Sequence, residues 1–413
     1  MNALKDKHII LGVTGSIAVY KAVDLASKLH QNGVLVDVIL TEAAARFVSP
    51  LTFQSVTGRK AYQDEDLWSS EDHVAHISLG KSADLMVVAP VTANTIFKLA
   101  HGEAGNLLTL TALAATCPLL IAPAMDGGMY QHPATQANLA ILQQRGAAVI
   151  GPESGHLASG LRQIGRMTEP TQLLGHIRTL LGREGPLSGK KVLVTAASTH
   201  EPLDPVRFIG NRSSGKQGFA LARAALDLGA EVILITGPAT LQTPAGAARI
   251  DVNTAQDMLQ AVTDHIADTH VLLMAAAVSD FRPKKYVEQK IKKGDKPSAI
   301  ELDSTPDVLK EIAAYKAKKG FPSVTVGFAA ESQDLLANAA KKLKEKKLDL
   351  IVANDITASD AGFAVDTNRV VLLSDSGKQQ ELPLLSKEQV AEEVLSHVVD
   401  LLSDKRPSSR KRK

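Results

Sequence analysis

The stretch HIILGVTGSIA, residues 8–18, decides the fold of the first half of the chain. It begins with an apolar run typical of a buried strand and continues into a glycine-containing turn. Residues 17–31 then carry apolar side chains at helical spacing, up to Gly33. A buried strand followed by a turn and a helix is the repeating unit of a parallel α/β sheet.

The same unit recurs along the first half of the chain. Helix-like segments separate most of the further predicted strands, which lie at residues 36–41, 85–91, 118–125 and 147–152. The connection LGREGPLSGK, residues 181–190, then concentrates Gly, Pro, Ser and charge, as segments between domains commonly do. We therefore predict a domain boundary near residue 190.

The architecture restarts after this connection. Strands are predicted at 191–196 and 231–236, with a long loop and a helix at 217–228 between them. Later strands are predicted at residues 271–278, 324–330, 348–355 and 369–374. We predict two doubly wound α/β domains with mostly parallel sheets, a flavodoxin- or Rossmann-like domain at 1–190 and a Rossmann-like domain at 191–404.

Composition narrows the class of protein. The chain has 413 residues, 45% of them hydrophobic, and a net charge of +2, so nothing global indicates nucleic-acid binding. No apolar stretch reaches the roughly 18 residues of a membrane span, and the first residues lack a secretory signal, so we expect a cytoplasmic protein. The basic tail, 405–413, is expected to be disordered and solvated rather than to bind a polyanion.

The chain contains a single cysteine, Cys117. One cysteine cannot form an internal disulfide or a cysteine-rich metal site. It begins a predicted buried strand, so we expect a small core residue.

Polar loops follow three of the predicted strands in the first half. Gly15 and Ser16 lie between a strand and a helix start, where backbone amides and the helix dipole can hold a phosphate, although an ordinary tight turn would explain this loop alone. The segments PVTANT, residues 90–95, and PAMDGGMY, residues 123–130, follow two further strands. Open α/β sheets bind ligands at the carboxyl ends of their strands, so these loops predict a mononucleotide site.

On these loops, residues 8–170 resemble the homo-oligomeric flavin-containing cysteine decarboxylases, which carry GSI-, PASANT- and PxMNxxMW-type motifs and an active-site histidine. The resemblance implies FMN-dependent oxidative decarboxylation of 4'-phosphopantothenoylcysteine, with His76 as the base of the oxidative stage and Met129 contacting the substrate. The FMN site that it implies consists of Gly15, Ser16, Ile17, Thr41, Thr92, Ala93, Asn94, Thr95 and Ala124.

Two catalytic positions depart from the pattern of these decarboxylases. Ser159 stands in a flap where the family usually has a proton-donating cysteine, and a serine hydroxyl is a far weaker acid than a thiol. Asp126 stands at the asparagine of the PxMNxxMW-type motif, where an ionised carboxylate would repel a substrate carboxylate. Either another donor acts, with His156 or a held water as candidates, or decarboxylation is impaired.

The segment THEPLDPVRFIGNRSSGKQG, residues 199–218, resembles the phosphopantothenate–cysteine ligases. Its hydrogen-bond donors crowd the start of a helix, which suits a phosphorylated substrate. Further matches follow in family order at 274–280, 290–293, 306–309 and 326–331, so the resemblance covers residues 188–375.

This second resemblance implies that CTP activates 4'-phosphopantothenate as an acyl cytidylate, from which the amine of cysteine displaces CMP. Asn211 would stabilise the cytidylate and, with Arg212, contact the phosphopantothenoyl group, while Lys290 would assist conversion of the intermediate. Lys342 and Lys346 would otherwise be assigned to a solvated helix face, but their spacing of four places both on one side. The implied CTP site consists of Met274, Ala275, Ala276, Asp280, Lys290, Pro306, Asp307, Val308, Leu309, Phe328, Lys342 and Lys346.

Together the resemblances imply a bifunctional enzyme of coenzyme A biosynthesis. Mg²⁺ is expected with CTP, but the sequence does not assign its ligands. Both families imply self-association, with trimers through the flavin domain, dimers through the ligase domain, and a dodecamer overall. The alternative is a working ligase fused to an FMN-binding domain whose decarboxylase is impaired and which serves assembly or regulation. An NAD-dependent dehydrogenase is not indicated, because neither half has a GxGxxG turn with an acidic ribose partner.

Overall fold

The computed structural model describes residues 3–68, 74–292, 299–331, 334–355 and 365–404. Within them the chain forms two compact units, which divide between Leu181 and Gly182. The division falls at the start of the Gly- and Pro-containing connection, whereas we placed the boundary near its end. The basic tail at 405–413 lies outside the described residues.

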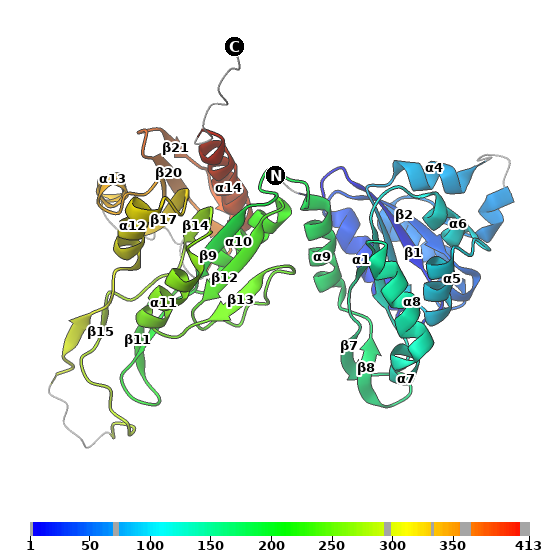
Figure 1. Ribbon diagram of the computed structural model, residues 1–413, viewed down its shortest axis with the longest axis horizontal. Helices are drawn as coiled ribbons and strands as arrows, with labels where there is room; N and C mark the ends of the chain where they lie inside the picture. The colour runs from blue at the N-terminus through cyan, green and yellow to red at the C-terminus, as the bar shows by residue number, and fades with distance from the viewer. Residues whose placement is uncertain (1–2, 69–73, 293–298, 332–333, 356–364, 405–413) are drawn as a thin grey trace, which may run out of the picture. The chain divides into compact units, whose positions relative to one another are not determined.

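The first unit contains a six-stranded parallel sheet with the strand order β3-β2-β1-β4-β5-β6. Figure 1 labels two of its neighbouring strands, β1 and β2. The strands of this sheet are β1 (His8–Val13), β2 (Leu35–Leu40), β3 (Ala61–Tyr62), β4 (Leu85–Val91), β5 (Leu119–Pro123) and β6 (Ala148–Val149). This is the doubly wound order of dinucleotide-binding folds, in which the chain changes direction between β1 and β4 and ligands bind at that point.

Helices cover both faces of this sheet because successive strand residues point to opposite sides. Ile9 and Leu11 of β1 pack with helices α1, α3 and α9, while Ile10 packs with helices α4, α5, α6 and α8. The helices of the unit are α1 (Val19–Gln31), α2 (Glu42–Ala45), α3 (Pro50–Thr57), α4 (Ala75–Ser82), α5 (Ala93–His101), α6 (Leu107–Ala114), α7 (Gly127–Gln131), α8 (Pro133–Gln144) and α9 (Pro170–Gly182), with a 3-10 turn at Asp64–Trp68. An antiparallel hairpin, β7 (Glu153–His156) and β8 (Arg162–Arg166), precedes α9.

The second unit contains an eight-stranded sheet with the order β13-β12-β9-β14-β17-β18-β20-β21. Its strands are β9 (Lys191–Ala196), β12 (Glu231–Thr236), β13 (Ala248–Asp251), β14 (Val271–Met274), β17 (Val324–Glu331), β18 (Leu350–Asp355), β20 (Val370–Ser374) and β21 (Gln379–Glu381). Strands β20 and β21 pair antiparallel, and the pairs among the other strands are parallel. The predicted fold class, two doubly wound and mostly parallel α/β domains, is confirmed.

Helices again lie on both faces of the second sheet. α10 (Lys216–Asp227) and α14 (Lys387–Asp404) share one hydrophobic core, whereas α11 (Ala255–His265), α12 (Val308–Lys319) and α13 (Leu335–Glu345) pack into two further clusters with the sheet. Among the described residues of this unit, three short antiparallel strand pairs lie outside this sheet: β10 (His200–Pro202) with β11 (Phe208–Gly210), β15 (Phe281–Pro283) with β16 (Leu302–Ser304), and β19 (Thr367–Asn368) with β22 (Leu385–Ser386). The first of them lies within the segment that we predicted as a long loop.

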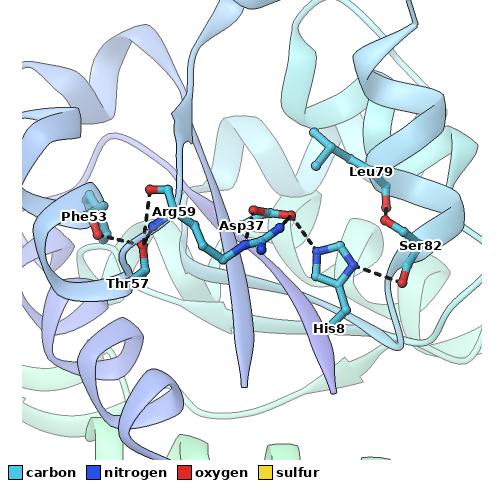
Figure 2. A network of polar contacts seen from close by, with 7 residues as sticks. All are labelled: His8, Asp37, Phe53, Thr57, Arg59, Leu79 and Ser82. Atoms are coloured by element: carbon cyan, nitrogen blue, oxygen red, sulfur yellow. Dashed lines mark hydrogen bonds and ion pairs between the residues drawn. The ribbon is translucent and has the colours of Figure 1, made fainter. Parts of the chain in front are cut away.

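A charged network ties the first two strands to the helices around them (Figure 2). Nε2 of His8 on β1 lies 2.6 Å from Oδ2 of Asp37 on β2, and its Nδ1 lies 3.0 Å from the Ser82 carbonyl oxygen. Arg59 donates two hydrogen bonds to the same Asp37 carboxylate, at 2.7 and 2.9 Å. Both ring nitrogens of His8 face acceptors, so the imidazolium form satisfies the site.

The network also shifts the titration of its members. The hydrogen bond to Asp37 raises the pKa of His8 above its usual value, although burial opposes this change. Burial alone would raise the pKa of Asp37, but the hydrogen bonds from His8 and Arg59 outweigh burial and lower it. Figure 2 shows His8 between the Asp37 carboxylate and Ser82 at the end of α4.

Candidate active sites

The predicted flavin loops of the first unit follow four adjacent strands, β2, β1, β4 and β5. Thr14 links two of these strand ends, because its hydroxyl donates to the Pro90 carbonyl at 2.8 Å and accepts from the Thr92 amide at 3.1 Å. The Thr41 amide donates to the Val13 carbonyl at 3.1 Å, which places the end of β2 beside β1. The residues that we predicted for FMN therefore gather at the carboxyl edge of the sheet.

The turn after β1 requires glycine at residue 15. A Cβ atom there would lie 2.5 Å from the Cβ of Ala43, and the neighbouring backbone of Ala43 cannot easily move. Helix α1 begins at Val19, and its N-cap residue, Ala18, makes no side-chain cap bond. Within the turn, the Ser16 amide donates to the Thr14 carbonyl at 2.9 Å, and the Ser16 hydroxyl accepts from the Ala18 amide at 3.3 Å. Such a close backbone approach and uncapped helix start fit a phosphate group.

Thr92 and His76 contribute side chains from helix starts. Thr92 caps α5, accepting a hydrogen bond from the Thr95 amide at 3.4 Å, which places Ala93 and Asn94 in the exposed first turn. His76 is the second residue of α4 and is half-buried. Its Nδ1 is buried and has no hydrogen-bond partner among the residues that the structure describes. A buried imidazole nitrogen without a partner fits a side chain that completes its hydrogen bonding with a ligand.

The two departures from the decarboxylase pattern lie in contact with each other. The Ser159 hydroxyl, between β7 and β8, donates to Oδ2 of Asp126 at 3.0 Å, while Oδ1 of Asp126 accepts from the Gly128 amide at 2.9 Å as the cap of α7. The hairpin is also held at its base, because the Met125 amide donates to the Gly165 carbonyl at 3.1 Å. Asp126 therefore fixes the flap to the end of β5.

Three other residues of the first unit, Met129, His156 and Cys117, differ in exposure and in position along the chain. Met129 on α7 is 52% exposed, and His156 is exposed on β7. Cys117 precedes β5, at the opposite end of that strand from Asp126, and packs among apolar side chains. Burial raises the pKa of its thiol. This position favours the predicted role of Cys117 as a core residue over a role as proton donor at the flap.

A cavity of about 710 Å³ lies at the carboxyl ends of the strands of the second unit. The loops after β11, β14 and β16 contribute to its wall, together with residues near the ends of β17 and β18. The predicted residues on this wall are Asn211, Met274, Ala275, Ala276, Asp280, Pro306, Asp307, Val308, Leu309, Phe328, Lys342 and Lys346. The predicted Arg212 and Lys290 are exposed and do not line it.

Asn211 is held against the loop that follows β14. Its backbone amide donates to the Ser198 hydroxyl at 2.9 Å, and its Nδ2 lies 3.2 and 3.3 Å from the carbonyl oxygens of Ala277 and Val278. The segment 199–218 and the segment 274–280, far apart in sequence, therefore meet at one side chain.

The two predicted lysines, Lys342 on α13 and Lys346 at its C-terminal cap, contact the opposite part of the cavity wall. Lys342 donates to the Phe328 carbonyl at 3.1 Å, and Lys346 forms an ion pair with Asp307, the cap of α12. Burial alone would raise the pKa of Asp307, but hydrogen bonds from Lys346 and from the Lys310 amide lower it. Spacing by four residues places both lysines on the cavity side of the helix, as we predicted.

Sequence reasoning missed several residues of this wall, namely Gln217, Asn354, Asn368 and Lys387. Lys387 is only 4% exposed and begins α14. A lysine at a helix start opposes the helix dipole, and this unfavourable placement was the signal that could have found it. Asn354 and Asn368 carry no comparable signal, since polar residues at strand ends are common.

Within the described ranges of both units, no group of three or more His, Cys, Asp or Glu side chains is arranged to hold a metal ion. Among those same residues no helix combines the length and apolarity that crossing a membrane requires.

A Rossmann-like unit with polar loops at four strand ends, followed by a second one with a large polar cavity, defines a two-domain protein of the flavoprotein class. Residues 2–182 match the family model Flavoprotein, and residues 187–402 match the DNA/pantothenate metabolism flavoprotein C-terminal domain.

Full-length relatives extend this assignment. The coenzyme A biosynthesis bifunctional protein CoaBC of Bacillus subtilis (strain 168) is 46% identical over 401 residues, which cover 96% of this chain and 98% of the relative. That of Vibrio vulnificus (strain YJ016) is 41% identical, covering 97% of this chain and 100% of the relative. A crystal structure of a CoaBC C-terminal domain, 42% identical, covers 53% of this chain and 99% of that domain, with a TM-score of 0.46. The chain belongs to the CoaBC family of bifunctional coenzyme A biosynthesis proteins.

Proposed function

We propose that the protein converts 4'-phosphopantothenate and cysteine to 4'-phosphopantetheine in two steps, CTP-dependent ligation and FMN-dependent decarboxylation. The observation that carries this proposal is the cavity of the second unit, where predicted CTP residues from distant parts of the chain converge. Coverage of almost the whole length of bifunctional relatives favours two working domains over a ligase fused to an impaired flavin domain.

In the ligation, the carboxylate of 4'-phosphopantothenate attacks the α-phosphorus of CTP and pyrophosphate leaves. In this proposal Asn211, whose amide nitrogen is held by the carbonyl oxygens of Ala277 and Val278, contacts the acyl group of the cytidylate. Lys342 and Lys346 supply positive charge on the cavity wall from α13. We propose that Mg²⁺ enters with the CTP phosphates, because magnesium commonly binds through substrate phosphates and keeps several waters.

Lys290 and Arg212 have a separate role in the proposal, because they lie outside the cavity. Both side chains are exposed and lie off the described cavity wall. We propose that they act from loops that approach the substrate when it is bound, with Lys290 neutralising phosphate charge and Arg212 contacting the phosphopantothenoyl group. A long cationic side chain on an exposed loop can make such a contact without a fixed position in the free protein.

For the decarboxylation, the loops at 15–17 and 92–95, with Thr41 and Ala124, fit a flavin mononucleotide. When bound, FMN supplies the oxidation and later reduction of the cysteinyl group that allow its carboxylate to leave. His76 accepts a proton in the oxidative stage, since its buried Nδ1 has no other hydrogen-bond partner among the described residues. Met129 offers an exposed apolar contact to the substrate.

The proton that completes the product comes from His156 in this proposal. The Ser159 proton is engaged by the Asp126 carboxylate, which makes the hydroxyl a still poorer acid. His156 lies three residues earlier in the same hairpin and is exposed. An imidazolium releases a proton near neutral pH.

One incubation tests the whole proposal. Purified protein is mixed with 4'-phosphopantothenate, CTP, Mg²⁺ and cysteine, and the products are separated by mass. We expect 4'-phosphopantetheine and CMP. Accumulation of 4'-phosphopantothenoylcysteine alone would reject the decarboxylase, and absence of any coupled product would reject the ligase.

A further inference from the structure

Part of the cavity wall is formed by the first turns of two helices, α10 and α14. Lys216 begins α10, Lys387 begins α14, and both side chains line the cavity. Nε2 of Gln217 donates to the Lys387 carbonyl at 3.1 Å, which joins the two turns. The start of α10 has no side-chain cap bond at Gly215, so its dipole and N–H groups favour an anion here.

Lys387 is an unusual residue for this position. Its side chain is 4% exposed, and a buried ammonium at a helix start is opposed by both desolvation and the dipole. Burial lowers the pKa of Lys387, and the nearby Lys216 lowers it further, against the opposing charges of Asp366 and Glu388. Residues placed against local energetic preference, such as a buried lysine at a helix start, occur mostly at functional sites. The positive charge of Lys387 therefore points to an anionic ligand.

The same wall also carries two acceptors that need donors. Oδ1 of Asn354 and Oε1 of Gln217 are buried and have no hydrogen-bond partner among the described residues. Asn354 is only 9% exposed, and both residues line the cavity. The orientation of the Gln217 amide follows from its donor bond to Lys387, so its oxygen is the atom left to accept.

We propose that Lys387, Lys216, Gln217 and Asn354 form the subsite for the amino-acid substrate of the ligase, cysteine. Lys387 and Lys216 bind its carboxylate, for which Lys216 exchanges its ion pair with Asp366 at 2.5 Å, and the two amide oxygens bind its amine. A zwitterionic α-amino acid presents an anion and several N–H donors on adjacent atoms, whereas a phosphate group presents mainly acceptors and would leave the amide oxygens unpaired. The inference rests on the ligase function proposed above.

The arrangement also suits the bond-forming step. Cysteine loses one ammonium proton, and the neutral amine attacks the acyl carbon of the cytidylate. The C–N bond forms, the bond from that carbon to the phosphate oxygen breaks, and CMP leaves with the bonding electrons while nitrogen releases a second proton. Two amide oxygens that hold two N–H groups leave the nitrogen lone pair free to point at the acyl carbon.

The test uses the full-length protein with Lys387→Met, and with Lys319→Met on the exposed end of α12 as the control. We expect the KM for cysteine to rise about 10- to 100-fold in Lys387→Met, since a charge-assisted hydrogen bond is lost. The KM for CTP and the formation of acyl cytidylate from CTP and 4'-phosphopantothenate without cysteine should not change. Lys319→Met should match the wild type in all three measurements.

Cysteamine, which lacks the carboxylate, gives a second readout that needs no variant. The wild type should use it with a KM about 10- to 100-fold above that for cysteine, and this preference for cysteine should shrink in Lys387→Met, where Lys216 alone is left to bind the carboxylate. Should Lys387→Met not fold, Asn354→Ala replaces it, with the same expected rise in the KM for cysteine.

Several results would overturn the subsite. They are an unchanged KM for cysteine, a raised KM for CTP, loss of cytidylate formation in a folded variant, or equal use of cysteine and cysteamine by the wild type. Loss of cytidylate formation or a raised KM for CTP would assign this wall to nucleotide phosphates instead. A wild-type protein that forms no cytidylate at all would reject the proposed ligase itself, which separates that failure from failure of the subsite.

Discussion

Asp126 and Ser159 are hydrogen-bonded to each other, so the two side chains act as a pair. A carboxylate that accepts from the serine keeps the proton on the serine oxygen and holds the flap against the start of α7. Neither effect makes Ser159 an acid. The exposed His156 is the residue of the hairpin best suited to return a proton.

We expect three variants of the first unit to differ in the stage at which the decarboxylation reaction stops. His156→Ala should accumulate an oxidised ene-thiol, because the proton donor is missing after CO2 has left. His76→Ala should stop before CO2 release, because the base of the oxidative stage is missing. Ser159→Ala, in the same hairpin, is the matched control and should change turnover little. Product masses and flavin absorbance distinguish these states, and full turnover in His156→Ala would eliminate it as the donor.

Asn211→Ala and Lys290→Ala should each suppress ligation by about 10²- to 10³-fold, the usual cost of losing one charge-stabilising donor. Neither side chain is part of a core, so the variants should unfold at the wild-type temperature. Lys285→Ala, an exposed lysine of the same loop as Lys290, serves as the control. The measurement is CMP release at saturating substrates, and near wild-type release in either variant would remove that residue from the mechanism.

At the scale of elements, the turn between β1 and α1 is determined by contact with the segment after β2. Gly15→Ala would force a Cβ to within 2.5 Å of Ala43, so the turn or α2 must move. We expect weaker flavin retention and a loss of about 1–3 kcal/mol of stability, the usual cost of overpacking. Gly105→Ala is the control, because its Cβ would first meet the flexible Glu103 carboxylate.

Flavin content is measured from the absorbance of purified protein, and stability from urea unfolding. Wild-type flavin content together with unchanged stability in Gly15→Ala would mean that the turn is not the phosphate cradle that we propose.

The network of His8, Asp37 and Arg59 makes the stability of the first unit depend on pH (Figure 2). The folded pKa of His8 lies above 6.5, so its contribution is complete below that pH and is lost as pH rises through the folded value. Asp37, whose pKa is lowered, contributes above its ordinary value of 3.8 and loses this contribution only in acid. The unfolding free energy should therefore fall as pH rises above about 6.5.

His8→Gln should remove this fall, while His30→Gln, on the exposed side of α1, should leave the fall in place. Tryptophan fluorescence in urea reports on the first unit, because the single tryptophan, Trp68, belongs to it. A pH profile that is the same in His8→Gln and in the wild type would contradict the assignment.

The sequence predicted elements well where burial alone determines them. Strands at 85–91, 191–196 and 231–236 coincide with β4, β9 and β12, because fully buried parallel strands consist of continuous apolar runs. The hairpin of β10 and β11 was not predicted, since each strand has only three residues and most of them are exposed or half-exposed. The antiparallel pairing of β20 was missed because direction depends on the connection rather than on the strand's own residues.

At the scale of the whole molecule, the sequence reveals site residues that lie in contiguous motifs and misses those that only tertiary packing brings to the site. Contiguous loops such as 90–95 and 274–280 are visible as motifs in the sequence. Lys387 reaches the cavity only because α14 packs on α10, about 170 residues away in the chain, and the sequence does not reveal that contact.

We expect the purified protein to form a dodecamer in solution. Large apolar side chains remain exposed on the first unit, including Tyr20 on α1 at 61% and Leu51 on α3 at 67%, and exposed apolar surface commonly marks association. Native mass spectrometry should give a mass near twelve chains. Tyr20→Asp with Leu51→Asp should lower that mass, and a wild-type monomer would refute the assembly.

The position of Cys117 also matters for a protein that handles thiols. Mixed disulfides form when a thiolate attacks, and the partial burial of Cys117 raises the pKa of this single thiol, which disfavours the thiolate. With serine at position 159, the flap adds no sulfur of its own. The protein therefore offers cysteine and its thiol product little with which to exchange, and a thiol-specific dye added during turnover would label mostly small molecules.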